Sequence, residues 1–212
     1  FIPAAKRMNA KIKRDIDPIN NDGITLIPQA MSIVADEVID LHRQLVPYGY
    51  DEINVNLGCP SGTVVSKKRG SGILAYPDML DSFLDELYTK ADFPVSIKTR
   101  VGFNDDELWP RLIEIYSKYP ISELTVHPRV QKDFYKNTPR MDDFALAMQK
   151  INPDKTTLCY NGDITDINSF NALTDCFPDI DEIMIGRGLF ANPALIAELK
   201  GISRIKPSFA SA

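Results

Sequence analysis

One cysteine of this chain stands in a setting that suits acid–base or nucleophilic chemistry. Cys59 lies between Gly58 and Pro60, directly after the predicted strand Glu52–Asn56, in a turn that the proline makes stiff. A thiol displayed there can act as a nucleophile, which requires a nearby base or cation. It can also act as a general acid that delivers a proton to carbon. These residues alone leave both roles open.

The other cysteines and the two histidines indicate neither a disulfide framework nor a metal site. The three cysteines are odd in number and lack CxxC spacing, which fits a reducing cytoplasm. We expect Cys159 and Cys176 to be small buried hydrophobic residues. His42 and His127 have no carboxylate or thiol at metal-ligand spacing, so no metal is expected.

Two glycine turns follow the last two predicted strands. They are Asn161-Gly162-Asp163 and Gly186-Arg187-Gly188. Glycines expose backbone N–H groups, and Arg187 adds a forked cation, so the pair suits a phosphate group. Either turn alone would more often close an ordinary strand–helix joint. Together they favour a phosphate site.

Two further polar residues belong to neighbouring predicted strands. Lys98 interrupts the otherwise apolar strand Val95–Arg100, where a buried ammonium group is costly unless it is paired. A contact with a cofactor is therefore favoured over a structural role for Lys98. His127 ends the strand Glu123–His127, and such a histidine is as often a capped core residue as a ligand.

These residues require a framework that brings strand ends together. Short apolar runs alternate with helix patterns whose apolar residues recur at helical spacing, and near-continuous apolar strands of this kind pair in parallel. We count about seven strands, starting from Phe1–Pro3. The other strand candidates are Ile24–Pro28, Glu52–Asn56, Val95–Arg100, Glu123–His127, Thr157–Asn161 and Glu182–Gly186.

This pattern predicts an α/β fold, a (β/α)8 TIM barrel that lacks its first strand in this chain. A doubly wound sheet is the alternative, but the glycine fingerprint expected after its first strand is absent. The polar residues also follow nearly every strand and do not gather at one switch point. We therefore expect them to meet at the carboxyl end of a barrel.

Composition and charge are those of an ordinary globular domain. The chain has 212 residues, of which 44% are hydrophobic and 25% charged, and its net charge is −5. No apolar run reaches the roughly 20 residues of a membrane helix, so no membrane contact is expected. An acidic total argues weakly against an RNA partner.

The distribution of basic residues changes that expectation. Loops that follow barrel strands share one face, so clusters in such loops would ring the mouth of the site and suit RNA. A solvated loop is the alternative for any one cluster. The clusters are Lys6, Arg7, Lys11, Lys13 and Arg14; Lys67, Lys68 and Arg69; and Lys132, Lys136 and Arg140.

The ordered set of motifs resembles the signature of tRNA-dihydrouridine synthases. It spans about residues 24–195, and although each motif is modest alone, the set is specific. The segments that carry the resemblance are Asn54-Val55-Asn56-Leu57-Gly58-Cys59-Pro60, then Gly70–Leu74, Val95–Gly102, Leu124–Arg129, Tyr160–Ile164 and Met184–Gly188.

The resemblance implies an FMN-dependent TIM barrel that uses NAD(P)H to reduce uridine in tRNA. Cys59 would protonate C5 of uracil while reduced FMN delivers hydride to C6. Asn56, Lys67, Arg100 and Arg129 would contact the substrate. The residues that would bind FMN are Gln29, Lys98, His127, Asn161, Gly162, Asp163, Gly186 and Arg187.

The resemblance also implies a division of the chain and leaves two alternative functions. Residues 1–200 would form the catalytic barrel of a cytoplasmic monomer, and residues 201–212 would begin the linker to a helical tRNA-binding domain. One alternative is another FMN barrel acting on a free small molecule, like a dihydroorotate dehydrogenase. The other is a catalytically idle RNA-binding relative, against which the intact Cys59 and Lys98 argue.

Overall fold

The computed structural model describes residues 1–4 and 7–201. Six strands form one parallel sheet whose neighbours follow the order of the chain. Ile2 adds an isolated parallel bridge to Ala30, so the predicted strand Phe1–Pro3 is present only as a single bridge beside the first strand of the sheet. The strands are β1 Gln29–Ala30, β2 Ile53–Leu57, β3 Val95–Gly102, β4 Glu123–Val130, β5 Thr157–Tyr160 and β6 Glu182–Ile183.

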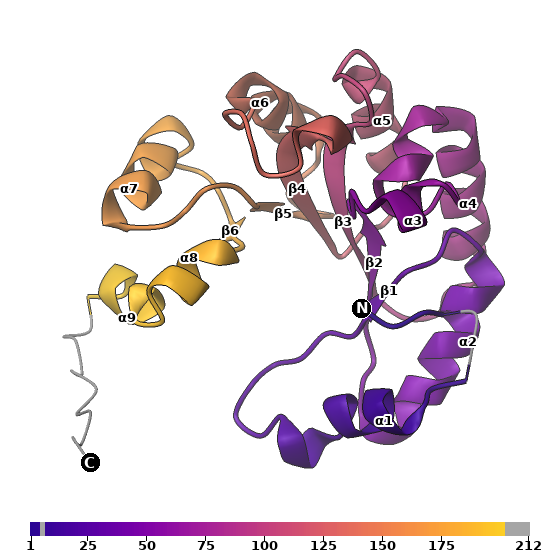
Figure 1. Ribbon diagram of the computed structural model, residues 1–212. Helices are drawn as coiled ribbons and strands as arrows, with labels where there is room; N and C mark the ends of the chain where they lie inside the picture. The colour runs from indigo at the N-terminus through magenta and orange to yellow at the C-terminus, as the bar shows by residue number, and fades with distance from the viewer. Residues whose placement is uncertain (5–6, 202–212) are drawn as a thin grey trace, which may run out of the picture.

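Helices follow the strands, and α2, α4, α5 and α6 form an arc around the outside of the sheet (Figure 1). Helix α4 begins with Pro77 in its first turn, where the missing backbone N–H of proline costs no helical hydrogen bond. None of the described helices is both long and apolar enough to cross a bilayer. The helices are α1 Ala10–Ile16, α2 Ala35–Leu45, α3 Gly62–Val65, α4 Pro77–Lys90, α5 Trp109–Tyr116, α6 Met141–Lys150, α7 Ile167–Cys176, α8 Arg187–Ala191 and α9 Leu195–Leu199.

The sequential strand order confirms the predicted fold class. A doubly wound sheet reverses its order at a switch point, whereas this sheet runs from β1 to β6 without reversal. That is the order of a (β/α)8 barrel. Among the described residues, β6 does not pair with β1 or with the Ile2 segment, so the sheet is an open arc.

The central strands alternate between apolar and polar residues, and this alternation positions the site. In β2 the apolar Ile53, Val55 and Leu57 are fully buried. The two asparagines between them, Asn54 and Asn56, form side-chain hydrogen bonds with residues of the neighbouring strands. Successive side chains in a strand point to opposite faces. One face therefore packs against the helices and the other is polar, which corrects the expectation of near-continuous apolar strands.

The predicted strand Ile24–Pro28 is wrong. The chain joins the sheet only at its end, where the Asn54 backbone N–H donates to the Pro28 carbonyl, and β1 begins at Gln29. Ile24 and Ile27 are 63% and 40% exposed. A β-branched run favours extended backbone, but only a partner strand makes it part of a sheet.

Candidate active site

A cavity of about 450 Å³ opens at the carboxyl ends of the strands. It receives side chains from β1 to β4 and from the loops that follow β2, β4, β5 and β6. Every residue predicted to bind a cofactor lines it, together with Cys59, Asn56 and Arg100. The full lining is Gln29, Asn56, Gly58, Cys59, Pro60, Lys98, Arg100, His127, Tyr135, Asn161, Gly162, Asp163, Met184, Gly186, Arg187 and Phe190.

The backbone of Cys59 is fixed on both sides. Its N–H donates to Asn56 Oδ1 at 2.9 Å, and the N–H of Gly58 donates to the same oxygen at 3.1 Å. Its carbonyl accepts from the Ser71 hydroxyl at 2.8 Å and from the Ser71 N–H at 3.1 Å. The half-buried thiol is therefore presented to the cavity from a rigid turn.

Gly70 permits that turn to close. Its φ is +55°, a left-handed conformation that glycine adopts without steric cost. A Cβ at this position would also lie 2.8 Å from the Cys59 carbonyl oxygen. The segment Gly70–Leu74, which the resemblance included, thus supports the loop that carries the thiol.

Lys98 brings an ammonium group to the floor of the cavity. Its Nζ donates to Asn161 Oδ1 at 2.6 Å, and the Asn161 amide donates in turn to the Met184 carbonyl. It makes no ion pair with a described residue. Burial, followed by the nearby Arg100 cation, lowers the pKa of Lys98 to about 8. A negatively charged ligand group would satisfy this cation.

His127 is held as a neutral imidazole. Burial and the neighbouring Arg100, Lys98 and Arg129 cations lower its pKa to about 3. Arg129 Nη1 lies 3.1 Å from His127 Nε2, and because arginine can only donate, Nε2 accepts. The remaining ring proton therefore sits on Nδ1, as a hydrogen-bond donor.

Asp163 joins two arginines at the rim of the cavity. Its carboxylate pairs with Arg129 and with Arg187. These pairs, led by the Arg129 hydrogen bond, hold the pKa of Asp163 below its usual range. Arg187 is half exposed and remains beside Gly186, where an added Cβ would meet nothing within 4 Å. The rim thus combines open backbone with a cation, as a phosphate site requires.

Arg100 ties the loops around the cavity together. Its guanidinium donates to the carbonyls of Gly58, Val130 and Phe134, which belong to the loop after β2 and to the end of β4 and its following loop. The side chain is only 2% exposed. This placement assigns Arg100 a structural contact, while its predicted contact with substrate stays a prediction.

Two other predicted substrate residues lie outside the cavity lining. Arg129 is 1% exposed, and its remaining donors bond to the carbonyls of Lys136 and Asn137. Lys67 is exposed in the loop that follows Cys59. Neither residue reaches the cavity directly, and their predicted roles remain predictions.

The prediction that the N-terminal basic cluster lies at the mouth of the cavity is wrong. The backbone N–H of Met8 donates to Gln44 near the end of α2, and Tyr50 Oη, just before β2, donates to the Ile16 carbonyl. Helix α1, which carries Lys11, Lys13 and Arg14, therefore lies at the amino ends of the strands, opposite the cavity. Lys6 falls outside the described residues.

Aromatic residues of the rim were missed from the sequence. Tyr135, 54% exposed, stacks near His127 and lies under Arg187, with 4.9 Å from the guanidinium carbon to the ring centre. Phe190 is 93% exposed and also lines the cavity. A signal was available for Tyr135, because it stands between the basic residues Lys132 and Lys136.

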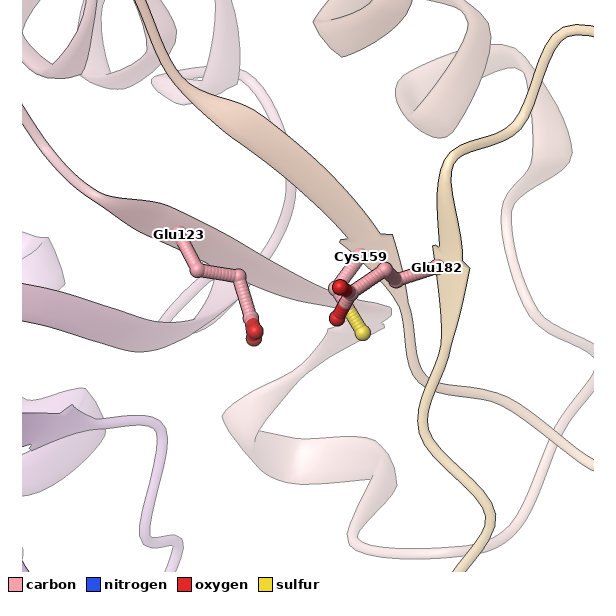
Figure 2. Close-up of side chains that lie close together, drawn as sticks. All are labelled: Glu123, Cys159 and Glu182. Atoms are coloured by element: carbon pink, nitrogen blue, oxygen red, sulfur yellow. The ribbon is translucent and has the colours of Figure 1, made fainter. Parts of the chain in front are cut away.

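A second cluster lies on the polar face of the sheet, farther from the mouth. Side-chain atoms of Glu123, Cys159 and Glu182 lie within 4.8 Å of one another, and Figure 2 shows them on neighbouring strands. Burial and both glutamates raise the pKa of Cys159 to about 12, so its thiol stays protonated. Cys159 is buried, as predicted, whereas Cys176 is exposed at the end of α7, which corrects that prediction.

The sheet order and the cavity define a parallel α/β protein of the (β/α)8 class, with its site at the carboxyl ends of the strands. A sequence model of the family described as "Dihydrouridine synthase (Dus)" matches residues 7–210. The chain belongs to the dihydrouridine synthase family.

Curated relatives agree with this membership. A protein named "Probable tRNA-dihydrouridine synthase" from Staphylococcus aureus is 34% identical over 154 residues, which are 71% of this chain and 46% of the relative. Proteins named "tRNA-dihydrouridine synthase B" are 29% identical over 79% of this chain in Pasteurella multocida and 30% over 77% in Escherichia coli. These matches cover 49% and 50% of the two relatives, so the chain spans about half their length.

Proposed function

We propose that this chain is the catalytic core of an FMN- and NAD(P)H-dependent enzyme that reduces uridine in tRNA to 5,6-dihydrouridine. The observation that carries the proposal is the convergence of the Cys59 thiol, the Lys98 ammonium group and two glycine turns on a single cavity. Family membership and the names of the relatives support the substrate.

The lining residues fit a flavin phosphate. Lys98 and the Nδ1–H of His127 offer donors to the polar edge of a planar ring, and Gln29 offers an amide. Gly162, Gly186 and Arg187 would hold the phosphate at the rim. When bound, reduced FMN supplies the hydride for C6 of uracil, and NAD(P)H supplies the electrons that restore it.

Cys59 would supply the proton that completes the reduction. Its Sγ–H bond breaks as the proton goes to C5, and the resulting thiolate regains a proton from solvent. The rigid turn serves this step because proton transfer requires a fixed distance between donor and acceptor. The target base would have to leave its stack to reach Cys59 within this cavity.

An absorbance spectrum of the full-length protein and dihydrouridine mapping in cells that lack it test this function. We expect the visible bands of bound flavin and the loss of dihydrouridine at defined tRNA positions. Reduction of a free pyrimidine, with tRNA left unchanged, would favour a small-molecule oxidoreductase. Flavin-free protein that binds tRNA would favour an idle relative.

The Cys59→Ala variant tests the proton donor. We expect it to retain flavin and to lose dihydrouridine formation by about 100-fold or more, the scale of general acid catalysis. Cys176→Ala is the matched control, since Cys176 is exposed at the end of α7, outside the lining of the cavity. Mass spectrometry of digested tRNA measures both, and normal turnover by Cys59→Ala refutes the role.

A further inference from the structure

A chain of side-chain hydrogen bonds runs beneath the cavity. Asn54 Nδ2 donates to Ser96 Oγ at 3.1 Å, and Asn54 Oδ1 accepts from Gln29 Nε2 at 2.7 Å. Gln29 Oε1 accepts in turn from Asn56 Nδ2 at 2.8 Å. The first three residues are direct neighbours in the sheet, because Gln29 pairs with Asn54 and Asn54 pairs with Ser96. This series of hydrogen bonds ends at Asn56 Oδ1, the oxygen that accepts from the backbone N–H of Cys59.

The direction of every bond in this chain is set at one end. The backbone N–H groups of Gly58 and Cys59 can only donate, so the Asn56 atom facing them must be its oxygen. The Asn56 amide nitrogen then faces Gln29, whose oxygen must accept and whose nitrogen must face Asn54. The same logic leaves the Asn54 oxygen toward Gln29 and its nitrogen toward Ser96.

A rotated amide anywhere in the chain would bring two donors or two acceptors together. Asn54 is 9% exposed and Ser96 is 2% exposed, so solvent offers little relief for such a mismatch. Gln29 and Asn56 both line the cavity, whereas neither Asn54 nor Ser96 does. The buried Asn54 oxygen therefore holds the Gln29 nitrogen, which leaves the Gln29 oxygen facing the Asn56 amide at the edge of the cavity.

We propose that Asn54, supported by Ser96, is a positioning residue for Cys59, acting through the side chains of Gln29 and Asn56. Its loss frees the Gln29 amide to rotate, which removes the acceptor of the Asn56 amide and loosens the turn that holds the thiol. This inference rests on the proposed function for its catalytic consequence. Its geometric consequence, the presentation of the Cys59 thiol, can be measured without turnover.

The test compares Asn54→Leu with Asn54→Asp in the full-length protein. Leucine removes both hydrogen bonds at similar size. Aspartate keeps the connection, because one carboxylate oxygen accepts from Gln29 and the other accepts from the Ser96 hydroxyl. Thr99→Val is the matched control, since it removes the buried hydroxyl on the helix-facing side of β3 that lies 2.9 Å from Tyr116 Oη and 3.0 Å from the Arg100 carbonyl. Ser96→Ala is a milder second variant if Asn54→Leu folds poorly.

Two quantities are measured for each variant: the rate of Cys59 alkylation by iodoacetamide, resolved by peptide mass spectrometry, and the kcat and KM of dihydrouridine formation. For Asn54→Leu we expect a change in alkylation rate of about threefold or more and a fall in kcat of about 10- to 100-fold, with KM for tRNA nearly unchanged. Asn54→Asp should recover most of both, and Ser96→Ala should shift both in the same direction. Thr99→Val should lower only the melting temperature.

Three results would overturn the inference. One is wild-type alkylation of Cys59 in Asn54→Leu. Another is an Asn54→Asp variant no better than Asn54→Leu, and the third is an equal change in Thr99→Val. If the protein fails to reduce tRNA at all, the alkylation series still decides the positioning role, so the two proposals fail separately.

Discussion

Lys98 carries a charge for which the described part of the chain provides no acidic partner. Burial lowers its pKa to about 8, whereas an unfolded lysine has a pKa of about 10.4. Between these values the unfolded chain binds more protons, so the free energy of unfolding rises with pH across that window. Below pH 8 the charge of Lys98 destabilises the ligand-free fold.

Replacing Lys98 therefore separates stability from binding. Lys98→Met should raise the free energy of unfolding of flavin-free protein at pH 7 by about 1–3 kcal/mol, and it should abolish the rise between about pH 8 and 10. It should also weaken flavin binding. Urea unfolding at pH 7 and pH 9.5 measures the first effect, with the exposed Lys155→Met as control. An identical pH dependence in Lys98→Met and wild type would contradict the argument.

The Arg100 side chain connects two loops at the carboxyl end of the sheet. Strand β3 lies between β2 and β4 in the sheet, so the loops that follow β2 and β4 are not adjacent. Arg100 nevertheless donates hydrogen bonds to a carbonyl in each of these loops. Gln131 adds a second connection by donating to the Pro60 carbonyl. The loop that carries Cys59 is therefore stable only as part of this cross-linked set.

The Arg100→Lys variant tests this cross-link. The compact ammonium group of lysine cannot span the three carbonyls that the guanidinium fork reaches, so we expect a loss of about 2–4 kcal/mol in the free energy of unfolding. Trypsin should also cut faster after Lys67–Arg69, because the loop opens more often. Arg111→Lys, at an exposed ion pair with Asp78, is the control and should change stability by less than about 0.5 kcal/mol. Unchanged proteolysis at Lys67–Arg69 would exclude a cross-linking role.

Polar residues within and directly after the predicted strands made much of the site predictable, although the alternation that gathers them on one face was not expected. Asn54, Asn56, Lys98 and His127 stand between apolar residues at a period of two, so one face had to collect them. The sequential strand order followed from the alternation of strands and helices. The two glycine turns were predictable because they end neighbouring strands.

What sequence could not supply depends on contacts between distant residues. The basic cluster in α1 follows the predicted strand Phe1–Pro3 in the sequence, but the hydrogen bonds of Met8 to Gln44 and of Tyr50 to Ile16 hold it at the opposite end of the sheet. Arg129 is buried because Asp163 and two backbone carbonyls surround it, and no local pattern encodes that. The strand at Gln29–Ala30 likewise depends on where β2 offers partners.

At the scale of the whole molecule, the basic clusters occupy opposite ends of the sheet. Lys67 and Lys136 lie on loops at the cavity end, exposed and without an ion pair in the described part of the chain. Lys11 and Lys13 lie on α1 at the other end. If tRNA lies across the cavity, only the first pair can neutralise its phosphates, although the two pairs contribute equally to net charge.

Paired double variants of the full-length protein exploit this difference. Lys67→Ala with Lys136→Ala should weaken tRNA binding and reduce the slope of log K against log salt by about 2, since each lost phosphate contact removes about 0.9. Lys11→Ala with Lys13→Ala changes the net charge identically and should leave the slope within about 0.5 of wild type. Titrations of labelled tRNA at several salt concentrations measure both slopes. Equal losses in the two variants would show that tRNA responds to total charge and not to the cavity end, and the proposed approach of the substrate would then be wrong.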